Sequence, residues 1–387
     1  MTQAELDSWD ERFETFHSRF ASYFCRSEPR EQAGKYMRGL LSPVRRKNVW
    51  QLAEAVGERK PDNMESFLHS AHWDADAVCN ELEQFVIEEF GDPEGIGIVD
   101  DTGFIKKGDK SVGVQRQYTG TAGKVENCQL GVFLGYAGRL GHTLIDRRLY
   151  MPEKWCSDEQ RRRDACVPPE IHFATKPLLA AEMLTHAFEV GVPMRWITGD
   201  EAYGDPPIVR ETVENGGRLY VLAVPCNTMV HACVKVSASE YFVRPKQVSE
   251  VAAGWPESKW RRVNTVSGEK GPIVYDWARE RVTETRHGEP GPAGWLLVRR
   301  SVSNPLEIAY YLSNAPVDTG IEELIRVASS RYKIEQCFEE AKGETGLDEY
   351  EVRYWQSWHR HITLSMMAHA FLSYLRKQED SPPPKMS

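Results

Sequence analysis

The order of apolar runs between residues 91 and 225 constrains the fold of this chain more than any other feature. Three short β-like runs come first, within the segments IGIVDD, QLGVFLGYAG and HTLIDRRLYMP. A helical pattern that ends at Gly191 follows, then the strand RWITGD, a second helix in DPPIVRETVENGG and the strand RLYVLAVP. This βββαβαβ order predicts an α/β fold that opens with a three-stranded meander.

Two short helices around a turn are predicted between residues 40 and 73, ahead of this segment. Arg45, Arg46 and Lys47 stand at the entry to the pair. One interpretation is a helix-turn-helix that contacts DNA, and the alternative is a generic helical hairpin, which is the commoner structure.

The remaining patterns complete the division of the chain. Apolar residues at spacings of three or four predict a helix over residues 6–20, and helices are also expected at about 318–342 and 352–376. After Pro225 the chain becomes rich in Trp, Gly and Arg, and β structure is predicted from there to the helix expected at residue 318. Asn304-Pro305 would form a hairpin turn within it. We therefore expect a helical DNA-binding domain (1–90), the first part of an α/β core (91–226), a β insertion (227–312), the completion of the core (313–376) and a disordered tail (377–387).

Composition excludes several classes of protein. At 387 residues the chain exceeds the roughly 250–300 residues of a single hydrophobic core, so a lone small binding module is excluded. No apolar run approaches the roughly 20 residues of a membrane span, and the acidic start MTQAELDSWDERF does not resemble an export signal. The 8 Cys contain no CxxC pair, which argues against a zinc ribbon or a disulfide framework. These features predict a cytoplasmic protein with free thiols and no membrane partner.

The charge of the chain is uneven. The net charge of −9 argues against indiscriminate affinity for nucleic acid. Nevertheless, two basic blocks, residues 26–60 and 102–151, flank residues 61–101, which hold twelve acidic residues and no Lys or Arg. Each block taken alone is also explained by a solvated surface.

Three acidic positions are candidates for chemistry. Asp100-Asp101 and Asp200 each follow an apolar run, and a divalent metal would offset the cost of placing carboxylates at a sheet end. An Asp at a strand end also commonly caps a helix or forms a turn. The third position is Glu335, which shares a predicted helix face with Arg331 and Lys342 at spacings of four and seven residues. Ion pairs in water would explain that face equally well.

Taken together, Asp100-Asp101-Thr102, Asp200 in GDEAYG and Arg331-x3-Glu335-x6-Lys342 resemble the three signature regions of DDE transposases of bacterial insertion sequences. The resemblance is to the cut-and-paste branch, which carries a β insertion between the second Asp and the Glu. The gap of 135 residues between Asp200 and Glu335 leaves room for it. One departure is Ala328, where the branch often has Tyr.

The resemblance implies a ribonuclease-H-like core in which Asp100, Asp200 and Glu335 hold two Mg²⁺ ions, with Mn²⁺ as a possible substitute. It also implies that Arg331 and Lys342 contact DNA phosphates. Its substrates would be double-stranded DNA, namely the terminal inverted repeats of its own element and target DNA. A homodimer in the DNA complex would hold two ends together, while the enzyme frees 3′-OH ends and joins them to the target.

Two other functions stay open at this point. One is a transposase-derived DNA-binding regulator that does not cut, and the other is a ribonuclease-H-like nuclease of different purpose, such as a junction resolvase. The four Trp of the expected insertion also allow two interpretations, because aromatic side chains among basic residues stack on extruded bases but also fill small β cores. These residues are Trp255, Trp260, Trp277 and Trp295.

Overall fold

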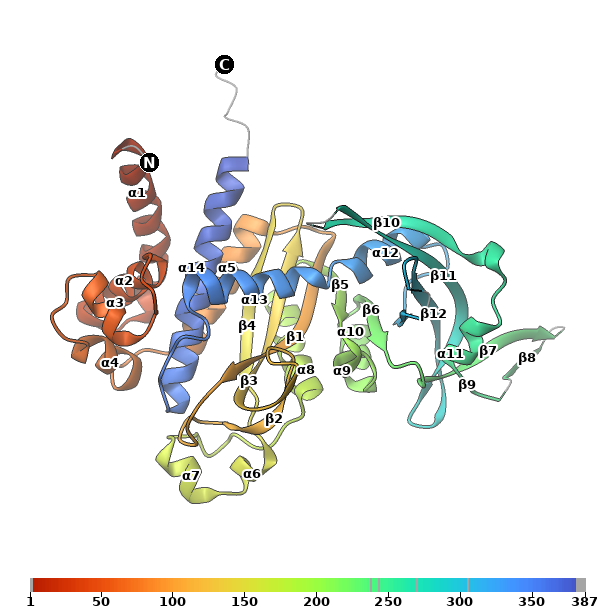
Figure 1. Cartoon of the computed structure of the whole chain (residues 1–387), viewed down its shortest axis with the longest axis horizontal. Helices are drawn as coiled ribbons and strands as arrows, with labels where there is room; N and C mark the ends of the chain where they lie inside the picture. Colours follow the sequence, from red (N-terminus) through yellow and green to blue (C-terminus); the bar gives the residue numbers. More distant parts are fainter. Residues whose placement is uncertain (1–2, 237–238, 243, 269–270, 305, 381–387) are drawn as a thin grey trace, which may run out of the picture. The chain divides into compact units, whose positions relative to one another are not determined.

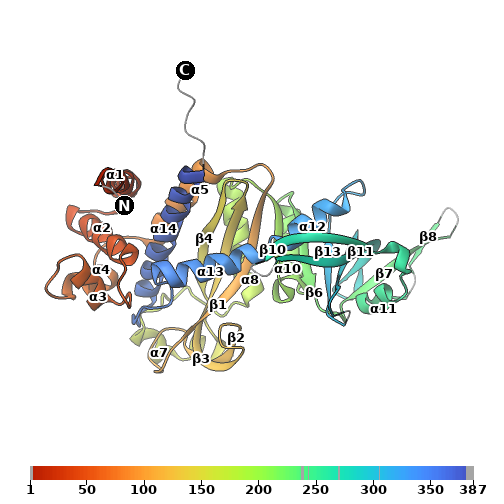
Figure 2. The ribbon, with the colours of Figure 1, turned by 45° about the horizontal axis from the view of Figure 1, so that its top comes forward.

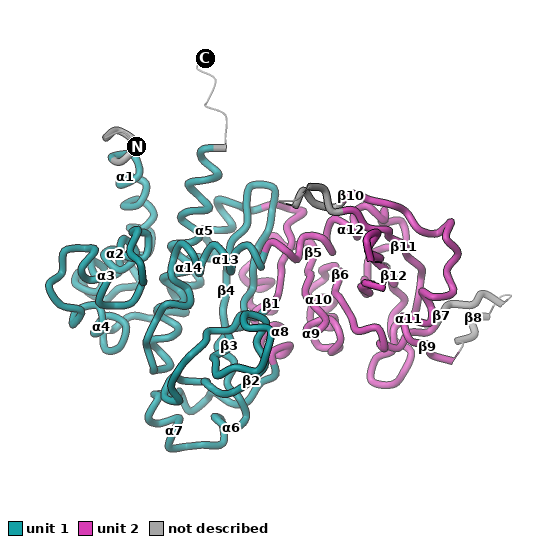
Figure 3. Tube along the Cα trace, in the orientation of Figure 1, with its two compact units in different colours: residues 1–91, 101–175, 334–387 teal, residues 92–100, 176–333 magenta. Residues whose placement is uncertain are grey.

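The computed structural model describes residues 3–236, 239–242, 244–268, 271–304 and 306–380, which fall into two compact units (Figures 1 and 3). Unit 1 consists of residues 1–91, 101–175 and 334–387, and unit 2 of residues 92–100 and 176–333. The division therefore falls inside one strand, between Asp100 and Asp101, and inside one helix, between Lys333 and Ile334.

Up to residue 91, the described part of unit 1 contains the helix expected over residues 6–20, which is α1 (Gln3–Arg19), the expected pair of short helices, and three further helical elements that the sequence patterns did not predict. In chain order, the elements after α1 are η1 (Ala21–Tyr23), α2 (Ser27–Leu41), α3 (Val49–Ala55), α4 (Asp62–His69) and α5 (Ala75–Phe90). The predicted pair of short helices is confirmed as α3 and α4, with Gly57 between them at a φ of 80°. Only glycine adopts that conformation without strain, which explains why the first helix ends there.

A single long helix, α14 (Trp355–Asp380), forms the centre of unit 1 (Figures 1 and 2). Every residue from 357 to 371 is buried, and α14 contacts α2, α4, α5 and β4 (Gly141–Leu149). The Phe371 ring lies 5.3–5.6 Å from the rings of Trp9, Phe13 and Phe16 of α1. The N-terminal helices therefore share one hydrophobic core with α14. Although α14 is long, no helix in the described part of the chain is apolar enough over sufficient length to cross a bilayer.

The end of α14 differs from the expected boundary. The helix continues through Asp380, whereas the sequence pattern placed its end at residue 376 and a disordered tail from 377. Residues 381–387 of that expected tail lie outside the described residues.

Three of the strands of unit 1 form two successive hairpins. β2 (Gln115–Thr119) pairs antiparallel with the start of β3 (Lys124–Gly138), and β4 pairs antiparallel with its later part. β3 is also hydrogen-bonded to β1 (Gly95–Ile105), whose second half belongs to this unit. The sequence predicted β1, β3 and β4 but not β2, because QRQYT has no apolar alternation. The short helices α6 (Glu153–Cys156) and α7 (Glu159–Asp164) follow β4.

Unit 2 contains a mixed sheet with helices on its parallel part (Figure 2). β1, β5 (Met194–Gly199) and β6 (Leu219–Val224) are parallel neighbours, joined through α8 (Lys176–Val190), α9 (Glu201–Gly204) and α10 (Pro207–Asn215). This is the αβαβ order that the sequence predicted. β13 (Ile308–Ser313) then pairs antiparallel with β6 and begins the antiparallel part of the sheet.

The antiparallel part contains the elements of the expected β insertion. They are β7 (Met229–Val236), β8 (Ser239–Phe242), β9 (Lys246–Gln247), α11 (Val248–Ala253), η2 (Glu257–Lys259), β10 (Arg261–Gly268), β11 (Gly271–Arg286) and β12 (Glu289–Ser301). β11 is the longest strand described and pairs with β7, β10 and β12. The turn after β12 contains Asn304, as expected for the hairpin, whereas Pro305 lies outside the described residues.

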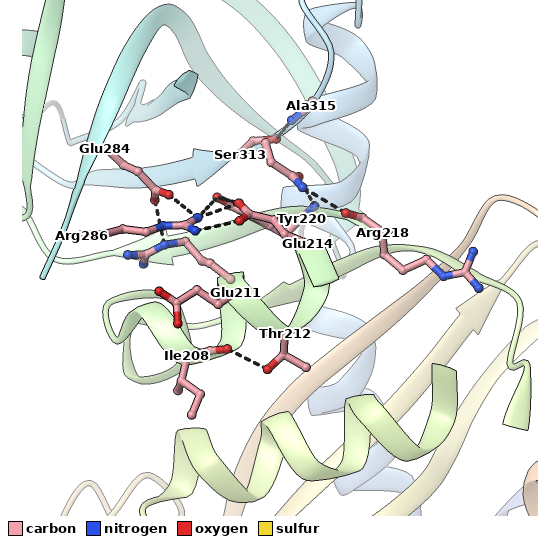
Figure 4. A network of polar contacts seen from close by, with 12 residues as sticks. Ile208, Glu211, Thr212, Glu214, Arg218, Tyr220, Glu284, Arg286, Ser313 and Ala315 are labelled. Carbon is pink, nitrogen blue, oxygen red and sulfur yellow. Dashed lines mark hydrogen bonds and ion pairs between the residues drawn. The ribbon is translucent and has the colours of Figure 1, made fainter. Parts of the chain in front are cut away.

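A buried ion network connects β11 with α10 and β6 (Figure 4). Glu284 of β11 forms an ion pair with Arg210 of α10 at 2.9 Å and a second ion pair with Arg286. Arg286 in turn lies 2.6 Å from Glu214, which accepts the Tyr220 hydroxyl at 3.2 Å. Arg210 is 2% exposed and Glu284 is 4% exposed, so the ion pair that links the long strand to α10 is buried, whereas Glu214 at the other end of the network is 24% exposed at its side chain.

A buried carboxyl group in unit 1 predicts a pH dependence of stability. Glu83 of α5 is 1% exposed, and burial together with Asp146 raises its pKa from 4.5 to about 8, although Arg147 and Arg148 oppose this. Between these pH values the folded protein keeps a proton that the unfolded chain releases, so this group makes the protein less stable as pH rises from 4.5 to 8. Glu83→Gln removes this contribution.

We therefore expect Glu83→Gln to raise stability by about 1–3 kcal/mol at pH 9, since each pKa unit corresponds to about 1.4 kcal/mol. The gain should vanish near pH 5, where the wild-type carboxyl is protonated. Urea unfolding at both pH values measures the difference. Glu88→Gln is the control on the same helix, because Arg19 lowers the pKa of Glu88 and no gain at high pH should follow. A gain for Glu83→Gln that is equal at both pH values would contradict this origin.

Candidate active site

Asp100 and Asp200 follow the paired ends of neighbouring parallel strands. The last paired residues of β1 and β5 in their register are Val99 and Gly199, so each aspartate is the next residue along its strand. Because β1 and β5 are parallel, both carboxylates lie at the same edge of the unit 2 sheet. The carboxyl ends of parallel strands are where open α/β sheets bind ligands.

Two glycines explain the local sequence GDEAYG. A Cβ at Gly199 would lie 2.8 Å from the Val99 side chain, and one at Gly204 would lie 1.9 Å from the Ala223 carbonyl oxygen. Any larger residue would separate β5 from β1 or α9 from β6. Asp200 caps α9, since its side chain accepts the Ala202 amide at 2.9 Å. The helix-cap interpretation is thus correct, and it orients this carboxylate.

Asp100 and Asp101 point to opposite faces of β1, because the strand continues through both residues and side chains alternate along a strand. The Arg331 Nη1 atom is 3.5 Å from the Asp100 carboxylate. On the other face, Asp101 lies near Cys128 of β3, where burial raises the pKa of the thiol and the charge of Asp101 adds to that effect. The two adjacent aspartates therefore have different partners.

Arg331 does not share a helix with Glu335, contrary to the predicted face. The expected helix over 318–342 is two helices, α12 (Ile321–Ser329) and α13 (Tyr332–Thr345), with Arg331 in the turn between them. The Ser330 hydroxyl donates to the Arg326 carbonyl at 2.7 Å, at the point where α12 ends. Glu335 is exposed in the first turn of α13 and belongs to unit 1, whereas Arg331 belongs to unit 2.

The Lys342 ammonium group is held by other residues of unit 1. It donates to the Thr102 hydroxyl at 2.7 Å and lies 3.4 Å from the Thr121 hydroxyl and 3.5 Å from the Gly103 carbonyl. Burial lowers the pKa of Lys342. No sequence pattern pointed to Thr121, which lies in the turn of the β2–β3 hairpin, although Thr102 stood in the quoted Asp-Asp-Thr motif.

The three basic residues before α3 have different environments. Arg45 and Arg46 are exposed, as a DNA contact requires, but Lys47 is 6% exposed. Its ammonium donates to the Leu40 and Ser42 carbonyls at 2.6 and 2.7 Å, at the end of α2. A lysine there satisfies carbonyls that have no partner within the helix. The predicted DNA contact of Lys47 is therefore replaced by a structural role.

The four Trp residues of the expected insertion also differ. Trp277 is 1% exposed and Trp295 is 8% exposed, so these two fill the core, and the Arg279 guanidinium packs 4.0 Å from the Trp295 ring centroid. Trp255 and Trp260 are half-buried, with Lys259 and Arg300 respectively at 4.4 Å from their rings.

Carboxylate oxygens at a sheet edge are the donors that Mg²⁺ prefers, so the pair of Asp100 and Asp200 fits a hard divalent ion. Among the described residues, no three His, Cys, Asp or Glu side chains are arranged as a metal site. The family model for DDE superfamily endonucleases matches residues 19–272, which include both aspartates. The chain belongs to the DDE superfamily of endonucleases.

The resemblance inferred from the signature residues is thereby confirmed at the level of the family, and the mixed α/β architecture of this DDE endonuclease fits a ribonuclease-H-like core. The match ends at residue 272, before Arg331, Glu335 and Lys342.

A curated relative is the probable transposase for insertion sequence element IS701 of Microchaete diplosiphon, which is 26% identical over 177 residues. This alignment covers 45% of the DDE endonuclease chain and 43% of the relative, so it spans less than half of either protein. Among solved structures, the NurA nuclease from Sulfolobus solfataricus matches with a TM-score of 0.27 and 9% identity, over 73% of this chain and 94% of that one.

Proposed function

We propose that this DDE endonuclease is a transposase that binds the terminal inverted repeats of its own element, cleaves DNA to free 3′-OH ends and joins them to target DNA. The observation that carries the proposal is the placement of Asp100 and Asp200 at neighbouring parallel strand ends within the family match. The printed name of the insertion-sequence relative supports the same function.

In this proposal Asp100, Asp200 and Glu335 hold two Mg²⁺ ions, which Mn²⁺ can replace. Two such ions, when bound, stabilise the attacking and leaving oxygens of an in-line displacement at phosphorus. All three side chains would supply carboxylate oxygens to hold these ions. The cap contact with Ala202 orients Asp200 before substrate arrives, and the buried strand β1 does the same for Asp100.

The basic residues act on DNA in different ways. Arg331 lies beside Asp100 and remains 35% exposed at its side chain, so it is placed to contact the phosphate next to that carboxylate. Arg45 and Arg46 contact the end of the element, with the N-terminal helices as its recognition part. Lys342, by contrast, acts through Thr102 and the end of β1. A homodimer would hold two ends together during cleavage.

The domain boundaries of the proposal remain those of the sequence: 1–90 for end recognition, 227–312 for the insertion, and 91–226 with 313–376 for the core. Because α1 packs on Phe371 of α14, deletion of residues 1–90 would expose a buried helix. Substitution of Arg45 and Arg46 is therefore the better test of end recognition.

The deciding experiment incubates the full chain with linear DNA that carries the flanks of its own gene and maps any breaks. We expect breaks with free 3′-OH at the element ends in Mg²⁺ or Mn²⁺ and none in excess chelator, because the proposed ligands are carboxylates, which hard divalent ions prefer.

Other results would select the alternatives. Full cleavage in excess chelator would refute the two-metal assignment. Selective end binding without breaks in either metal would indicate the regulator that does not cut. Breaks with no preference for the element ends would indicate a nuclease of other purpose.

A further inference from the structure

The β2–β3 hairpin presents an unusual exposed face. Side chains alternate along β2, so Arg116 and Tyr118 point outward on one face, opposite Asn127 and Val125 of β3 in the antiparallel register. Tyr118 is 65% exposed and Val125 is 50% exposed. An aromatic and an aliphatic side chain side by side in water, next to an arginine, indicate a surface that is covered by a partner.

The charges around this face favour an anionic partner. Residues 106–127 hold five Lys or Arg against two acidic residues, in a chain whose net charge is −9. Lys106 is engaged by Tyr350, since it donates to the Tyr350 carbonyl at 2.9 Å and packs on its ring, but Lys107 and Lys110 are exposed. The loop before β2 and the outer face of the hairpin therefore carry a local excess of positive charge.

The turn of the hairpin is anchored beside the strand that carries Asp100. The Thr121 hydroxyl is 3.2 Å from both the amide nitrogen and the carbonyl oxygen of Gly103. It also lies 3.4 Å from the Lys342 ammonium and from the Thr102 hydroxyl. Thr102 follows Asp100 by two residues, a span of at most about 7 Å. The anchor thus ties the turn to the part of β1 directly after the aspartate.

We infer that the β2–β3 hairpin, residues 115–127, is a ribbon that contacts duplex DNA and that Thr121 positions its turn against Thr102 and Gly103 of β1. The inference rests on the proposed function, because it assigns a DNA-contacting surface next to the proposed cleavage site. A two-stranded ribbon fits the major groove in width, Arg116 pairs with a phosphate, and Tyr118 packs on the sugar-phosphate backbone. Exposed Gly120 and Gly123 leave the backbone of the turn open to the same surface.

The binding test compares two double variants of the full chain. Arg116→Gln with Tyr118→Ala changes the hairpin face, and Arg139→Gln with Leu140→Ala changes an equally basic and apolar exposed pair at the other end of β3. Fluorescence anisotropy with a short labelled duplex measures affinity at several salt concentrations. We expect the hairpin variant to bind about tenfold more weakly, with a salt slope lower by about 1 for the lost phosphate contact. The Arg139 and Leu140 variant should bind like the wild type.

Equal affinity of the hairpin variant and the wild type, or equal losses in both variants, would overturn the inference. A wild type that binds DNA but never cleaves it would refute the proposed function, and the binding comparison would still decide the role of the hairpin. If the wild type does not bind duplex DNA, the proposed function and the role of the hairpin are both refuted.

The positioning role of Thr121 has its own test. Thr121→Val removes the hydroxyl from an exposed turn, so the fold should survive, whereas Thr121→Ser keeps the hydroxyl. We expect Thr121→Val to lower the cleavage rate about tenfold or more at saturating DNA, because small displacements near a reacting centre are costly, and Thr121→Ser to restore it. A wild-type rate for Thr121→Val, or a failure of Thr121→Ser to restore the rate, would refute the positioning role.

Discussion

Asp100→Asn should lower DNA cleavage by several orders of magnitude while DNA binding survives. The substitution keeps the shape of the side chain but removes a negative charge that the proposed site shares between two divalent cations. Asp100 is the residue of β1 directly after its last pair with β5, and its carboxylate lies 3.5 Å from Arg331, at the sheet edge that it shares with Asp200. The release of 3′-OH ends and, with pre-cut ends, strand transfer are both to be measured, because one site serves both steps.

Asp101→Asn is the matched control, because it makes the same chemical change one residue away. Its side chain points to the opposite face of β1, toward Cys128, so substantial activity should remain. An inactive Asp101→Asn beside an active Asp100→Asn would reverse the assignment. Loss of strand transfer alone in Asp100→Asn would refute a shared site.

Glu284→Ala should cost the protein about 3–5 kcal/mol of stability, the range for breaking a buried ion pair. Glu284 is 4% exposed and pairs with both Arg210 and Arg286, so its removal leaves the Arg210 guanidinium buried without that partner (Figure 4). Burial raises the pKa of Glu284, and the charges of Arg210 and Arg286 oppose this. Urea unfolding of the full chain measures the loss.

Two further variants make this prediction specific. Arg210→Met with Glu284→Leu removes both charges, so it should recover much of the stability lost in Glu284→Ala, since apolar groups of similar volume replace buried pairs well. Arg261→Ala breaks an exposed pair with Glu322 in the same unit and should leave stability close to that of the wild type. Equal losses for the buried and the exposed pair would contradict the argument.

Much of the secondary structure followed from local pattern. The helix of residues 176–190, the strands 194–199 and 219–224 and the helix 207–215 agree with their predicted positions, because buried strands and amphipathic helices have distinct apolar periods. The sequence did not reveal β2, whose side chains are mostly polar because one face meets solvent. The break between α12 and α13 at Ser330 also escaped, since helical spacing continued across it.

In the candidate site, too, some features could be predicted from local sequence and others could not. Asp100 and Asp200 were found because each follows an apolar run, and the strand register places both at one sheet edge. The surroundings of Lys342 and Lys47 could not be found, because their partners are Thr121 and the carbonyls at the end of α2. A charged residue near a motif suggests a DNA contact, but only packing shows whether its side chain reaches solvent.

By itself the sequence determined the family and the α/β class and indicated the candidate aspartates, because these depend on residue type and on spacing along the chain. The tertiary structure decided which of the adjacent aspartates faces Arg331, which lysines are buried, and that α1 shares a core with α14. It also decided that Glu284 meets Arg210 and that Thr121 meets Lys342 across more than 70 and 200 residues respectively. Such contacts arise from closure of long loops around a packed core, and no local pattern encodes them.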